Sequence, residues 1–492
     1  MGTSILRGGI TLGMEVGPRD TRGHNRIFQG STKKAGENMK TNLKTKVQSD
    51  RELVEGLLFE PGSKQAAHHQ GASEGYRLRT LEGLEEFLWL SEVTNPHPAM
   101  IVAEVEGRTQ VDDWRRALGQ VAERYPLLSV RIRKERGKRP YFETLPDVEI
   151  PLRVIPLEGA DLDYLAAEET VTSFGYGDGV LARAILCHSA ERCAILFSAH
   201  HAITDGKTNI RIVEDLIAAA SGESLGARFP VLPALGELFG LGEPGPYVEV
   251  SAAAKAPASY VRYDLPVPRV ERHHFEAGDL KAVLATANEE GTTVHGALLA
   301  AFLLAGRQLA ERWRTAPVVC RSPIDLRPML ELYGIPGLII GTHRSVMQPS
   351  DNLPFWEFAR VLKKDMLPSQ TKEVTAKALK AVREVLGREG DPDDTTTIDQ
   401  EGFFRHDLMV SNYGDPGVRT SFGGLSLRAL YPSVASGFGD TQAISMVTVD
   451  GTLYITHTSR QPLRSLVEDA LAILRDACAV SSMMKVGAKA RR

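Results

Sequence analysis

Residues His200–Gly206, with the sequence HHAITDG, carry the strongest signal in this chain. They follow an apolar run over residues 194–199 that predicts a buried strand. After them, apolar side chains recur with the spacing of one helix face, at Ile210, Val213, Leu216, Ile217 and Ala220. A strand, a tight turn and a helix in this order would hold an imidazole rigidly at the strand end, which suits a catalytic base.

The side chains within this stretch support that interpretation. Gly206 would let a substrate approach the backbone closely, and Asp205 could pair with a cation and hold the turn. A histidine after a strand is also common as a hydrogen-bonded core or surface residue. Both interpretations stay open on the motif alone.

Composition places the chain among ordinary globular proteins. Its 492 residues correspond to two or three domains, with 42% hydrophobic and 24% charged residues. A formal net charge of −4 argues against a dedicated nucleic-acid binder, so no nucleic-acid partner is expected.

The four cysteines, Cys187, Cys193, Cys320 and Cys478, show no CxxC spacing. We therefore expect no metal site and four reduced thiols in a cytoplasmic protein. The longest apolar stretch, residues 296–306, is shorter than the roughly 18–20 residues that cross a bilayer, so no transmembrane segment is expected. The N-terminus lacks the order of a secretory signal.

Residues 1–75 have the composition of a largely disordered extension, and the folded region is expected to begin near Tyr76. Beyond it, helical and strand patterns alternate without strict order, which predicts an α+β fold. Helices are expected at 81–90 (with Leu81, Leu84 and Leu88 facing inward), from Asp112 or Asp113 to 125, and at 279–287, 293–313, 355–366, 372–386 and 463–479. Strands are expected at 99–105, 127–133, 181–187, 193–199, 271–276, 318–323, 407–412, 425–431, 443–449 and 452–458.

The pattern HHxxxDG at His200–Gly206 resembles the active-site motif of the condensation-domain superfamily of CoA-dependent acyltransferases. The segment Pro323–Arg327 (PIDLR), which follows the predicted helix from 293, is similar to the polyketide-associated branch known as the phthiocerol dimycocerosyl transferase type. Together with the patterns at 81–90 and 114–131, the resemblance covers about residues 76–480. No DFGWG segment is present, so the plant BAHD branch is not expected.

The resemblance implies two chloramphenicol-acetyltransferase-like subdomains with a tunnel between them. It places an N-terminal half carrying HHxxxDG at 76–245, a linker at 246–257, a C-terminal half at 258–482 and a basic tail at 483–492.

The resemblance also implies roles for individual residues. His201 would be the catalytic base, and His200 would support the turn. Asp205 would form a structural ion pair with Arg327; otherwise Arg327 is a surface loop residue. Ser411 and Asn412 would line the tunnel, or would serve only as turn residues.

The activity implied is direct transfer of an acyl group from an acyl-CoA or an acyl carrier protein to an alcohol acceptor. No cofactor is expected beyond the CoA or phosphopantetheinyl thioester that serves as substrate. Two alternatives remain: amide formation by a standalone nonribosomal-peptide-type condensation enzyme with an amine acceptor, and a non-catalytic condensation-like recruiting module.

Overall fold

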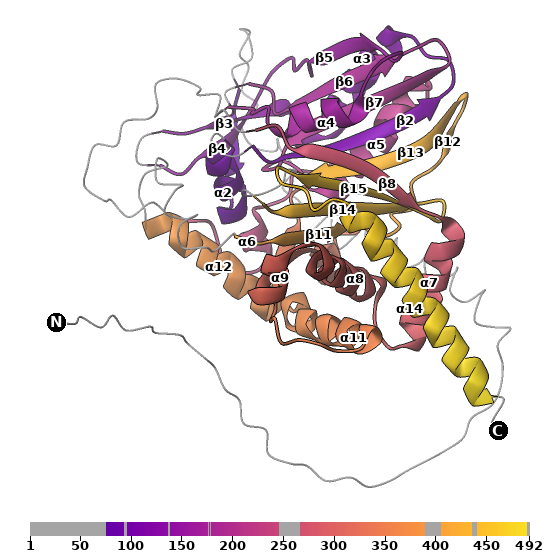
Figure 1. The fold of residues 1–492 in the computed structure, drawn as a ribbon. Helices are drawn as coiled ribbons and strands as arrows, with labels where there is room; N and C mark the ends of the chain where they lie inside the picture. The colour runs from indigo at the N-terminus through magenta and orange to yellow at the C-terminus, as the bar shows by residue number, and fades with distance from the viewer. Residues whose placement is uncertain are drawn as a thin grey trace, which may run out of the picture. The chain divides into compact units, whose positions relative to one another are not determined.

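The computed structural model describes residues 75–92, 96–135, 138–175, 177, 179–245, 266–388, 405–434 and 440–489. The expected extension before Tyr76, apart from Gly75, lies outside these residues, as does the expected linker at 246–257. Figure 1 shows the succession of strands and helices along the chain.

A six-stranded sheet contains the strand that leads into HHAITDG. Its central strand, β7 (Arg192–His200), runs antiparallel to both neighbours, and its side chains are buried from Cys193 to His200. In spatial order the sheet consists of β12 (Ser421–Phe422), β13 (Leu425–Val434), β2 (Pro98–Glu106), β7, β6 (Ala182–His188) and β5 (Leu152–Pro156).

Both faces of this sheet are covered, which explains the continuous apolar run of β7. On one face, Ile195 and Phe197 join the core that includes helices α3 (Val111–Arg124) and α5 (Gly206–Ala220). On the other face, Leu196 packs with side chains of α4 (Leu162–Thr170). A strand buried on both faces cannot alternate apolar and polar residues.

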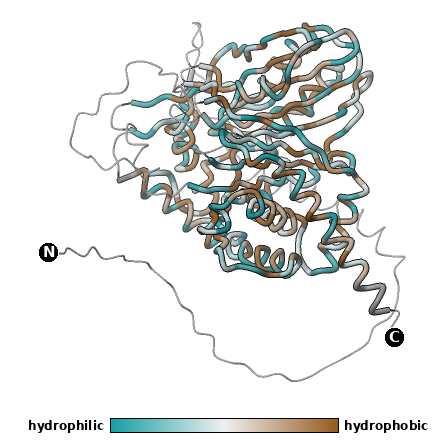
Figure 2. The backbone as a smooth tube through the Cα atoms, in the orientation of Figure 1, coloured by the Kyte–Doolittle hydropathy of each residue, from teal (hydrophilic) through white to brown (hydrophobic). Residues whose placement is uncertain are grey.

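The second six-stranded sheet has helices packed on one side (Figure 1). Its strands in spatial order are β10 (Ile340–Met347), β9 (Val318–Asp325), β11 (Leu408–Asn412), β14 (Gln442–Val449), β15 (Thr452–Ser459) and β8 (Arg269–Phe275). The helices are α7 (Ala277–Glu289), α8 (Val294–Leu309), α9 (Glu311–Thr315), α11 (Phe355–Met366) and α14 (Leu466–Lys489). Helix α8 is almost wholly buried, and Figure 2 marks it as predominantly apolar.

Smaller elements complete the described chain. A three-stranded sheet has the order β1 (Arg77–Thr80), β4 (Tyr141–Thr144) and β3 (Val130–Arg133), and lies next to α2 (Gly83–Ser91). The remaining helices are η1 (Pro126–Ser129), α6 (Leu235–Leu238), α10 (Arg327–Leu330), η2 (Leu367–Gln370) and α12 (Lys372–Arg388). No helix of the described residues is both long and apolar enough to cross a bilayer.

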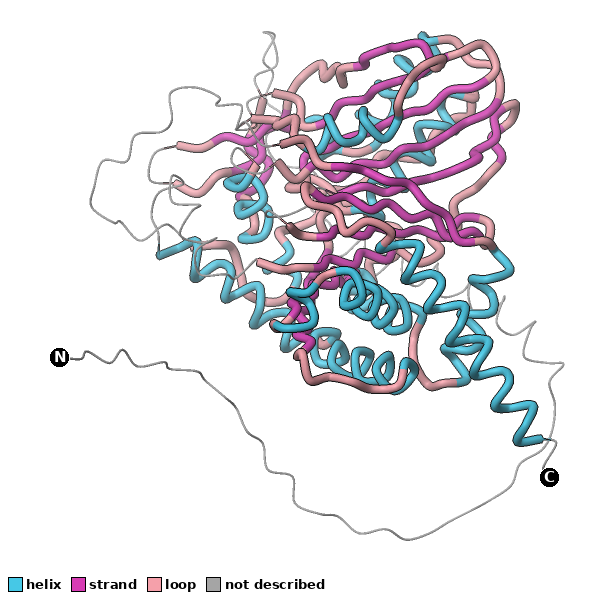
Figure 3. Tube along the Cα trace, in the orientation of Figure 1, coloured by secondary structure: helices cyan, strands magenta, loops and turns pink. Residues whose placement is uncertain are grey.

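Strand β13 joins the two parts of the molecule. It follows β11 of the second sheet in the chain, yet it pairs with β2 of the first sheet from Ser426 to Val434. The sheets also contact each other through side chains, since the Tyr454 hydroxyl of β15 donates to the Arg428 carbonyl of β13 at 2.8 Å. In Figure 3 the strands of the two sheets, drawn in magenta, lie close together.

The prediction of an α+β fold is confirmed, and most predicted elements are present within a few residues. The strand predicted at 127–133 is shorter than expected. Pro126 starts a 3-10 turn, so the strand begins only at Val130. The predicted helix 293–313 is interrupted at Ala310, which has extended dihedral angles. Helix α14 ends at Lys489, well into the expected basic tail.

Two details of helix orientation were also wrong. Helix α3 is capped at Gln110, and Asp113 accepts from the Gln110 N–H at 2.7 Å rather than serving as the cap itself. Helix α2 buries Glu85 and Glu86 more completely than Leu84 and Leu88, which are only half-buried.

Those acidic residues are buried because arginines pair with them. Glu82, just before α2, is 1% exposed and holds Arg383 of α12 through two hydrogen bonds of 2.6 Å each. The same carboxylate accepts from the Gly83 and Gly236 N–H groups at 2.8 and 2.7 Å. Arg79 and Arg139 pair in the same way with Glu85 and Glu86. Sequence periodicity cannot reveal such pairs, because the two partners are up to 301 residues apart.

We expect Glu82→Gln to lower the free energy of unfolding by about 3–5 kcal/mol, because it leaves the Arg383 guanidinium buried without its carboxylate. Denaturant unfolding monitored by circular dichroism would measure the change. The matched control is Glu106→Gln, whose pair with Arg428 is exposed and should contribute less than about 1 kcal/mol. Equal losses in the two variants would contradict the interpretation.

Candidate active site

The HHAITDG stretch forms the end of β7, a tight turn and the beginning of α5. Asp205 is the N-cap of α5, and its Oδ1 accepts from the Thr208 N–H at 2.9 Å. The turn is fixed to β2 by a short chain of bonds: the Thr204 hydroxyl donates to Asn209 Oδ1 at 2.9 Å, and Asn209 Nδ2 donates to the Ala99 carbonyl at 2.7 Å. The motif therefore rests on a rigid strand and a capped helix.

His201 has the geometry of a base with one nitrogen available. Its Nδ1 lies 2.8 Å from the Thr204 carbonyl oxygen, which can only accept a hydrogen bond. Nδ1 must therefore carry the proton, and in the neutral imidazole the lone pair is on Nε2. His201 is half-buried.

His200 differs from His201 in its burial and in its hydrogen bond. It is fully buried, and its Nδ1 accepts from the Ala202 N–H at 3.0 Å. Burial lowers the pKa of His200 to about 3, with smaller contributions from His201, His97 and Arg183. The imidazole is therefore neutral at physiological pH. Its buried Nε2 has no hydrogen-bond partner among the described residues.

The predicted ion pair between Asp205 and Arg327 is present. Arg327 Nη1 lies 2.9 Å from Asp205 Oδ2, and the two residues are 122 positions apart. Ile339 N–H donates to the same carboxylate at 3.0 Å. Arg327 also contacts Asp325, Thr208 and two backbone carbonyls, at Ile335 and Gly337. The pair thus joins the turn after β7 to the segment after β9.

Opposing effects act on the pKa of Asp205. Burial of the carboxyl group would raise it, but the charge and hydrogen bonds of Arg327, with those from Thr208 and Ile339, outweigh burial and hold the pKa below its ordinary value. Burial would likewise lower the pKa of Arg327, and the two carboxylates beside it raise it instead. Both groups are charged at neutral pH.

Gly206 has no room for a side chain. A Cβ built on it would lie 2.3 Å from ring atoms of Tyr413. The ring therefore occupies the space beside the backbone that the sequence suggested for a substrate. Burial raises the pKa of the Tyr413 phenol, and the Asp205 carboxylate raises it further, so the hydroxyl keeps its proton.

The two other predicted residues differ in their surroundings. Ser411 is buried in β11, whereas Asn412 Oδ1 accepts from the Gly414 N–H at 2.9 Å and shapes the turn. Across the sheet Ser411 is paired with Ser445, and Ser445 with Thr456, so three hydroxyls share one face. The Thr456 hydroxyl is buried without a hydrogen-bond partner among the described residues, whereas Ser411 and Ser445 hydrogen-bond to the Tyr413 phenol. Sequence reasoning missed Tyr413, Ser445 and Thr456, because only strand register brings them together.

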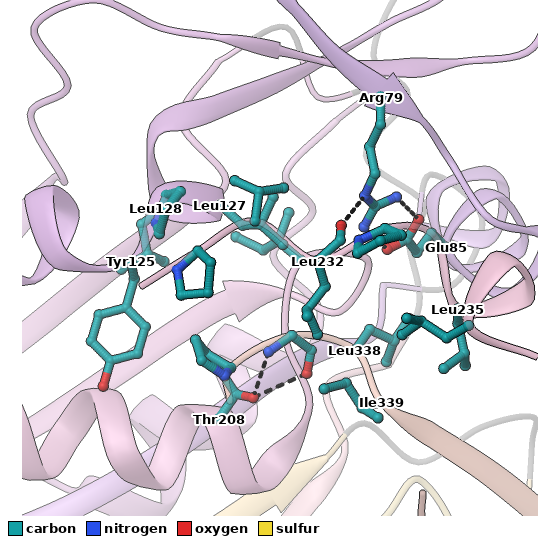
Figure 4. Close-up of a pocket in the computed structure, with 18 of the residues that line it drawn as sticks. Arg79, Glu85, Tyr125, Leu127, Leu128, Thr208, Leu232, Leu235, Leu338 and Ile339 are labelled. Atoms are coloured by element: carbon teal, nitrogen blue, oxygen red, sulfur yellow. Dashed lines mark hydrogen bonds and ion pairs between the residues drawn. The ribbon is translucent and has the colours of Figure 1, made fainter. Parts of the chain in front are cut away.

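An apolar pocket lies behind the motif turn (Figure 4). It encloses about 570 Å³, its open mouth included, and is lined by Ile203, Thr208, Ile339 and other mainly apolar residues. The Arg79–Glu85 ion pair closes one end. His201 is not among its lining residues. Within the described part of the chain, no group of His, Cys, Asp and Glu side chains could hold a metal ion.

We expect the stability contributed by Asp205 to depend on pH. A carboxyl group whose folded-state pKa is lowered stabilises the fold above its unfolded pKa of about 3.9, and this contribution is lost as the pH falls through the folded value. Asp205→Asn should therefore lower the free energy of unfolding by about 3–5 kcal/mol at pH 7, and the difference from wild type should shrink below about pH 5. Denaturant unfolding at pH 7, 4 and 3 would measure it. A difference independent of pH would count against the assigned charge state, and Asp112→Asn, at an exposed position, is the control.

We also expect Gly206→Ala to cost about 1–3 kcal/mol, because the added methyl group displaces the Tyr413 ring. In a Tyr413→Ala background the cost should largely disappear, which a double-mutant cycle of unfolding free energies would detect. Gly119→Ala on α3, where a Cβ meets no atom within 4 Å, is the control. Additive costs at Gly206 and Tyr413 would show that the two do not contact each other in solution.

A family model described as the C-terminus of phthiocerol/phthiodiolone dimycocerosyl transferase matches residues 265–331. This range includes β8, α7, α8, β9 and Arg327. It is the same part of the chain that carries the PIDLR segment.

The fold is similar to those of several solved structures. The structure of polyketide synthase associated protein 5 from Mycobacterium tuberculosis gives a TM-score of 0.59 at 15% identity, with 83% of this chain and 100% of that chain covered. Trichothecene 15-O-acetyltransferase from Fusarium sporotrichioides gives 0.57 at 13% identity, with 82% and 97% covered. The first condensation domain of the CDA synthetase gives 0.56 at 16% identity, again with 82% and 97% covered. At these identities the similarity establishes a common fold.

Sequence relatives are much longer proteins that match only in part. Tyrocidine synthase 3 of Brevibacillus parabrevis is 24% identical over 291 residues, which are 55% of this chain and 4% of that protein. A plipastatin synthase of Bacillus subtilis is 26% identical over 280 residues, which are 52% of this chain and 10% of that protein. The chain thus spans a tenth or less of these relatives. The chain has the fold of these condensation domains and acyltransferases, and its match to the family model is confined to residues 265–331.

Proposed function

We propose that this chain transfers an acyl group from a CoA or carrier-protein thioester to an alcohol, with His201 as general base. The observation that carries the proposal is the hydrogen bond from His201 Nδ1 to the Thr204 carbonyl, which leaves the Nε2 lone pair available. A base must accept a proton, and a half-buried imidazole with its Nε2 lone pair available suits that task.

The reaction would proceed without an acyl-enzyme. His201 Nε2 takes the hydroxyl proton of the acceptor as its oxygen attacks the thioester carbonyl carbon. The tetrahedral intermediate then collapses, the carbon–sulfur bond breaks, and the thiolate leaves and receives the proton from His201. Backbone N–H groups near Gly206 are our candidates for stabilising the oxyanion.

The neighbouring residues have supporting roles in this proposal. His200 is neutral and buried, so it fixes the strand end rather than exchanging protons. Asp205 is fully engaged by Arg327, Thr208 and Ile339, so it orients the turn and does not act as a second base. Ser411 is proposed to line the path of the substrate, whereas Asn412 has a turn role that its hydrogen bond already explains.

Several wider assignments are part of the same proposal. We infer two acyltransferase halves, approximately 76–245 and 258–482, with a tunnel between them that His201 faces. The thioester serves as substrate, and no further cofactor takes part. A cytoplasmic location would keep the buried thiols of Cys187, Cys193, Cys320 and Cys478 reduced.

Amide formation is the second candidate, because the fold is also similar to that of a synthetase condensation domain. The chemistry at His201 would be the same, with an amine in place of the hydroxyl group. The acceptor therefore has to be identified by experiment.

We expect His201→Ala to reduce acyl transfer by about 10²–10⁴-fold while the protein stays folded, because general-base catalysis contributes about that much. Intact-mass analysis of reactions containing a panel of acyl thioesters, with alcohols and amines as acceptors, would measure transfer and reveal the preferred nucleophile. His274→Ala, at an exposed histidine of β8, is the matched control and should keep full activity.

Near-wild-type turnover in folded His201→Ala protein would refute the role of His201. Absence of transfer by the wild-type protein across the whole panel, with normal folding, would instead favour a non-catalytic recruiting module.

A further inference from the structure

Glu92 is a buried carboxylate that has no role in the chemistry above. It follows the last residue of α2 and is 1% exposed. Its two oxygens bind backbone rather than a basic side chain: one accepts from the Phe174 N–H at 2.8 Å, and the other from the His97 N–H at 3.1 Å. Burying a carboxylate is costly unless it is hydrogen-bonded, and here the bonds join two segments that are distant in the chain.

Both segments lead to His200, the fully buried first histidine of the motif. Pro98, which follows His97, is the partner of His200 across the sheet. The ring of Phe174 packs against the His200 imidazole, with 5.9 Å between the ring centroids and 48° between their planes. This is the geometry of a favourable aromatic pair. The Glu92 carboxylate therefore connects two neighbours of one buried imidazole.

Further contacts hold Phe174 in this position. The Arg183 guanidinium lies over the Phe174 ring, 4.0 Å from its centroid, and is itself held by the Glu169 carboxylate at 2.7 Å. The hydroxyl of Ser173 donates to the Glu92 carbonyl at 3.3 Å and accepts from the Gly175 N–H at 2.8 Å. The aromatic ring against His200 is thus fixed at its backbone by Glu92 and at its side chain by Arg183.

The position of His200 in turn determines the backbone on both sides of His201. Its Nδ1 accepts from the Ala202 N–H at 3.0 Å, and its carbonyl accepts from the Ile203 N–H at 3.0 Å. A shift of the His200 ring would therefore displace the turn from which the His201 side chain projects.

We propose that Glu92 is a positioning residue for the HHAITDG motif. By binding the N–H groups of His97 and Phe174, its carboxylate forms a clamp on His200, and through His200 it sets the orientation of His201. This inference rests on the proposed function, in which His201 is the base. Glu92 lies behind His200 in this series of contacts, so it acts through geometry and takes no proton from a substrate.

The charge of Glu92 changes close to neutral pH. Burial raises the pKa of Glu92 to about 7, and the hydrogen bonds from Phe174 and His97 and the charge of Arg183 oppose burial only in part. Above this pH both carboxylate oxygens accept. Below it, one oxygen carries the proton and becomes a donor, so it no longer matches an N–H group. The clamp is therefore complete only when Glu92 is ionised.

The elements packed around Glu92 also supply other titratable groups, namely His97, Glu169, Arg183 and His200. His200 stays neutral, because burial lowers its pKa to about 3. Arg183 and Glu169 are paired with each other. A substitution at Glu92 therefore decides whether a pH effect near neutrality belongs to this carboxylate or to His97.

The first experiment compares acyl transfer by the wild type and by Glu92→Gln, which keeps the shape of the side chain and is neutral at every pH. At about pH 8.5 the variant should have a kcat about tenfold lower, as expected for a slightly misplaced base, with KM within about twofold. At about pH 6 the two kcat values should converge, because wild-type Glu92 is then mostly protonated. Titration of His201 affects both proteins, so it cancels in the ratio.

The matched control is Glu149→Gln, at an exposed glutamate, which should equal the wild type at both pH values. A ratio of wild-type to Glu92→Gln kcat that is the same at both pH values would overturn the clamp, since a purely structural role does not depend on the charge of Glu92. Equal kcat values at the higher pH would overturn it as well.

A second measurement needs no turnover. In protein labelled with carbon-13 in its histidine rings, the NMR signal of His200 is assigned by its absence from a His200→Gln protein. It should shift with a midpoint near pH 7, although the imidazole itself stays neutral. The shift should vanish in Glu92→Gln. It should shrink in Phe174→Leu, which removes the ring contact and keeps the carboxylate, and this variant decides if Glu92→Gln does not fold.

The two measurements separate this inference from the proposed function. Absence of acyl transfer, together with a His200 signal that follows the ionisation of Glu92, would refute the function and support the clamp. Acyl transfer with a pH-independent kcat ratio, and a His200 signal that does not move near pH 7, would leave the function intact and remove the clamp.

Discussion

The contact between the Asp205 carboxylate and the Arg327 guanidinium constrains the geometry of everything around the motif. Asp205 caps α5, accepts from the backbone at Ile339 and pairs with Arg327, so one carboxylate connects the first sheet, the helix and the segment after β9. Its charge is tolerated at 1% exposure only because every lone pair has a donor nearby. The turn that carries His201 therefore cannot move without disturbing both sheets.

Near the Asp205–Arg327 ion pair, the adjacent His200 and His201 differ in their chemistry because their surroundings differ. Full burial keeps His200 neutral, whereas half-exposed His201 has its tautomer fixed by the Thr204 carbonyl. The Tyr413 ring lies against Gly206 of the motif, and Ser411, Ser445 and Thr456 form a row across the second sheet. Ser411 and Ser445 hydrogen-bond to Tyr413, and the buried Thr456 hydroxyl has no partner among the described residues, which is uncommon in proteins.

Features set by neighbouring residues could be predicted from the sequence, whereas contacts between residues far apart in the chain mostly could not. The strand, turn and helix around HHAITDG follow from local apolar periodicity, and they were predicted correctly. The ion pair of Asp205 with Arg327 was also predicted, but only through resemblance, since no local rule connects positions 122 residues apart. Glu82, Glu86 and Tyr413 escaped prediction because their partners come from distant segments. Edge strand β10 lacks a strong apolar pattern and was missed for that reason.

The route of β13 has a consequence for how the chain acquires its structure. Arg428 and Glu106 form an ion pair across 322 residues, and the whole edge of β2 stays uncovered until residues 425–434 have been synthesised. Such non-local pairing raises contact order and slows folding, and an open strand edge invites association with other chains. During synthesis, the sheet that carries His200 can therefore be completed only after residues 425–434 have left the ribosome.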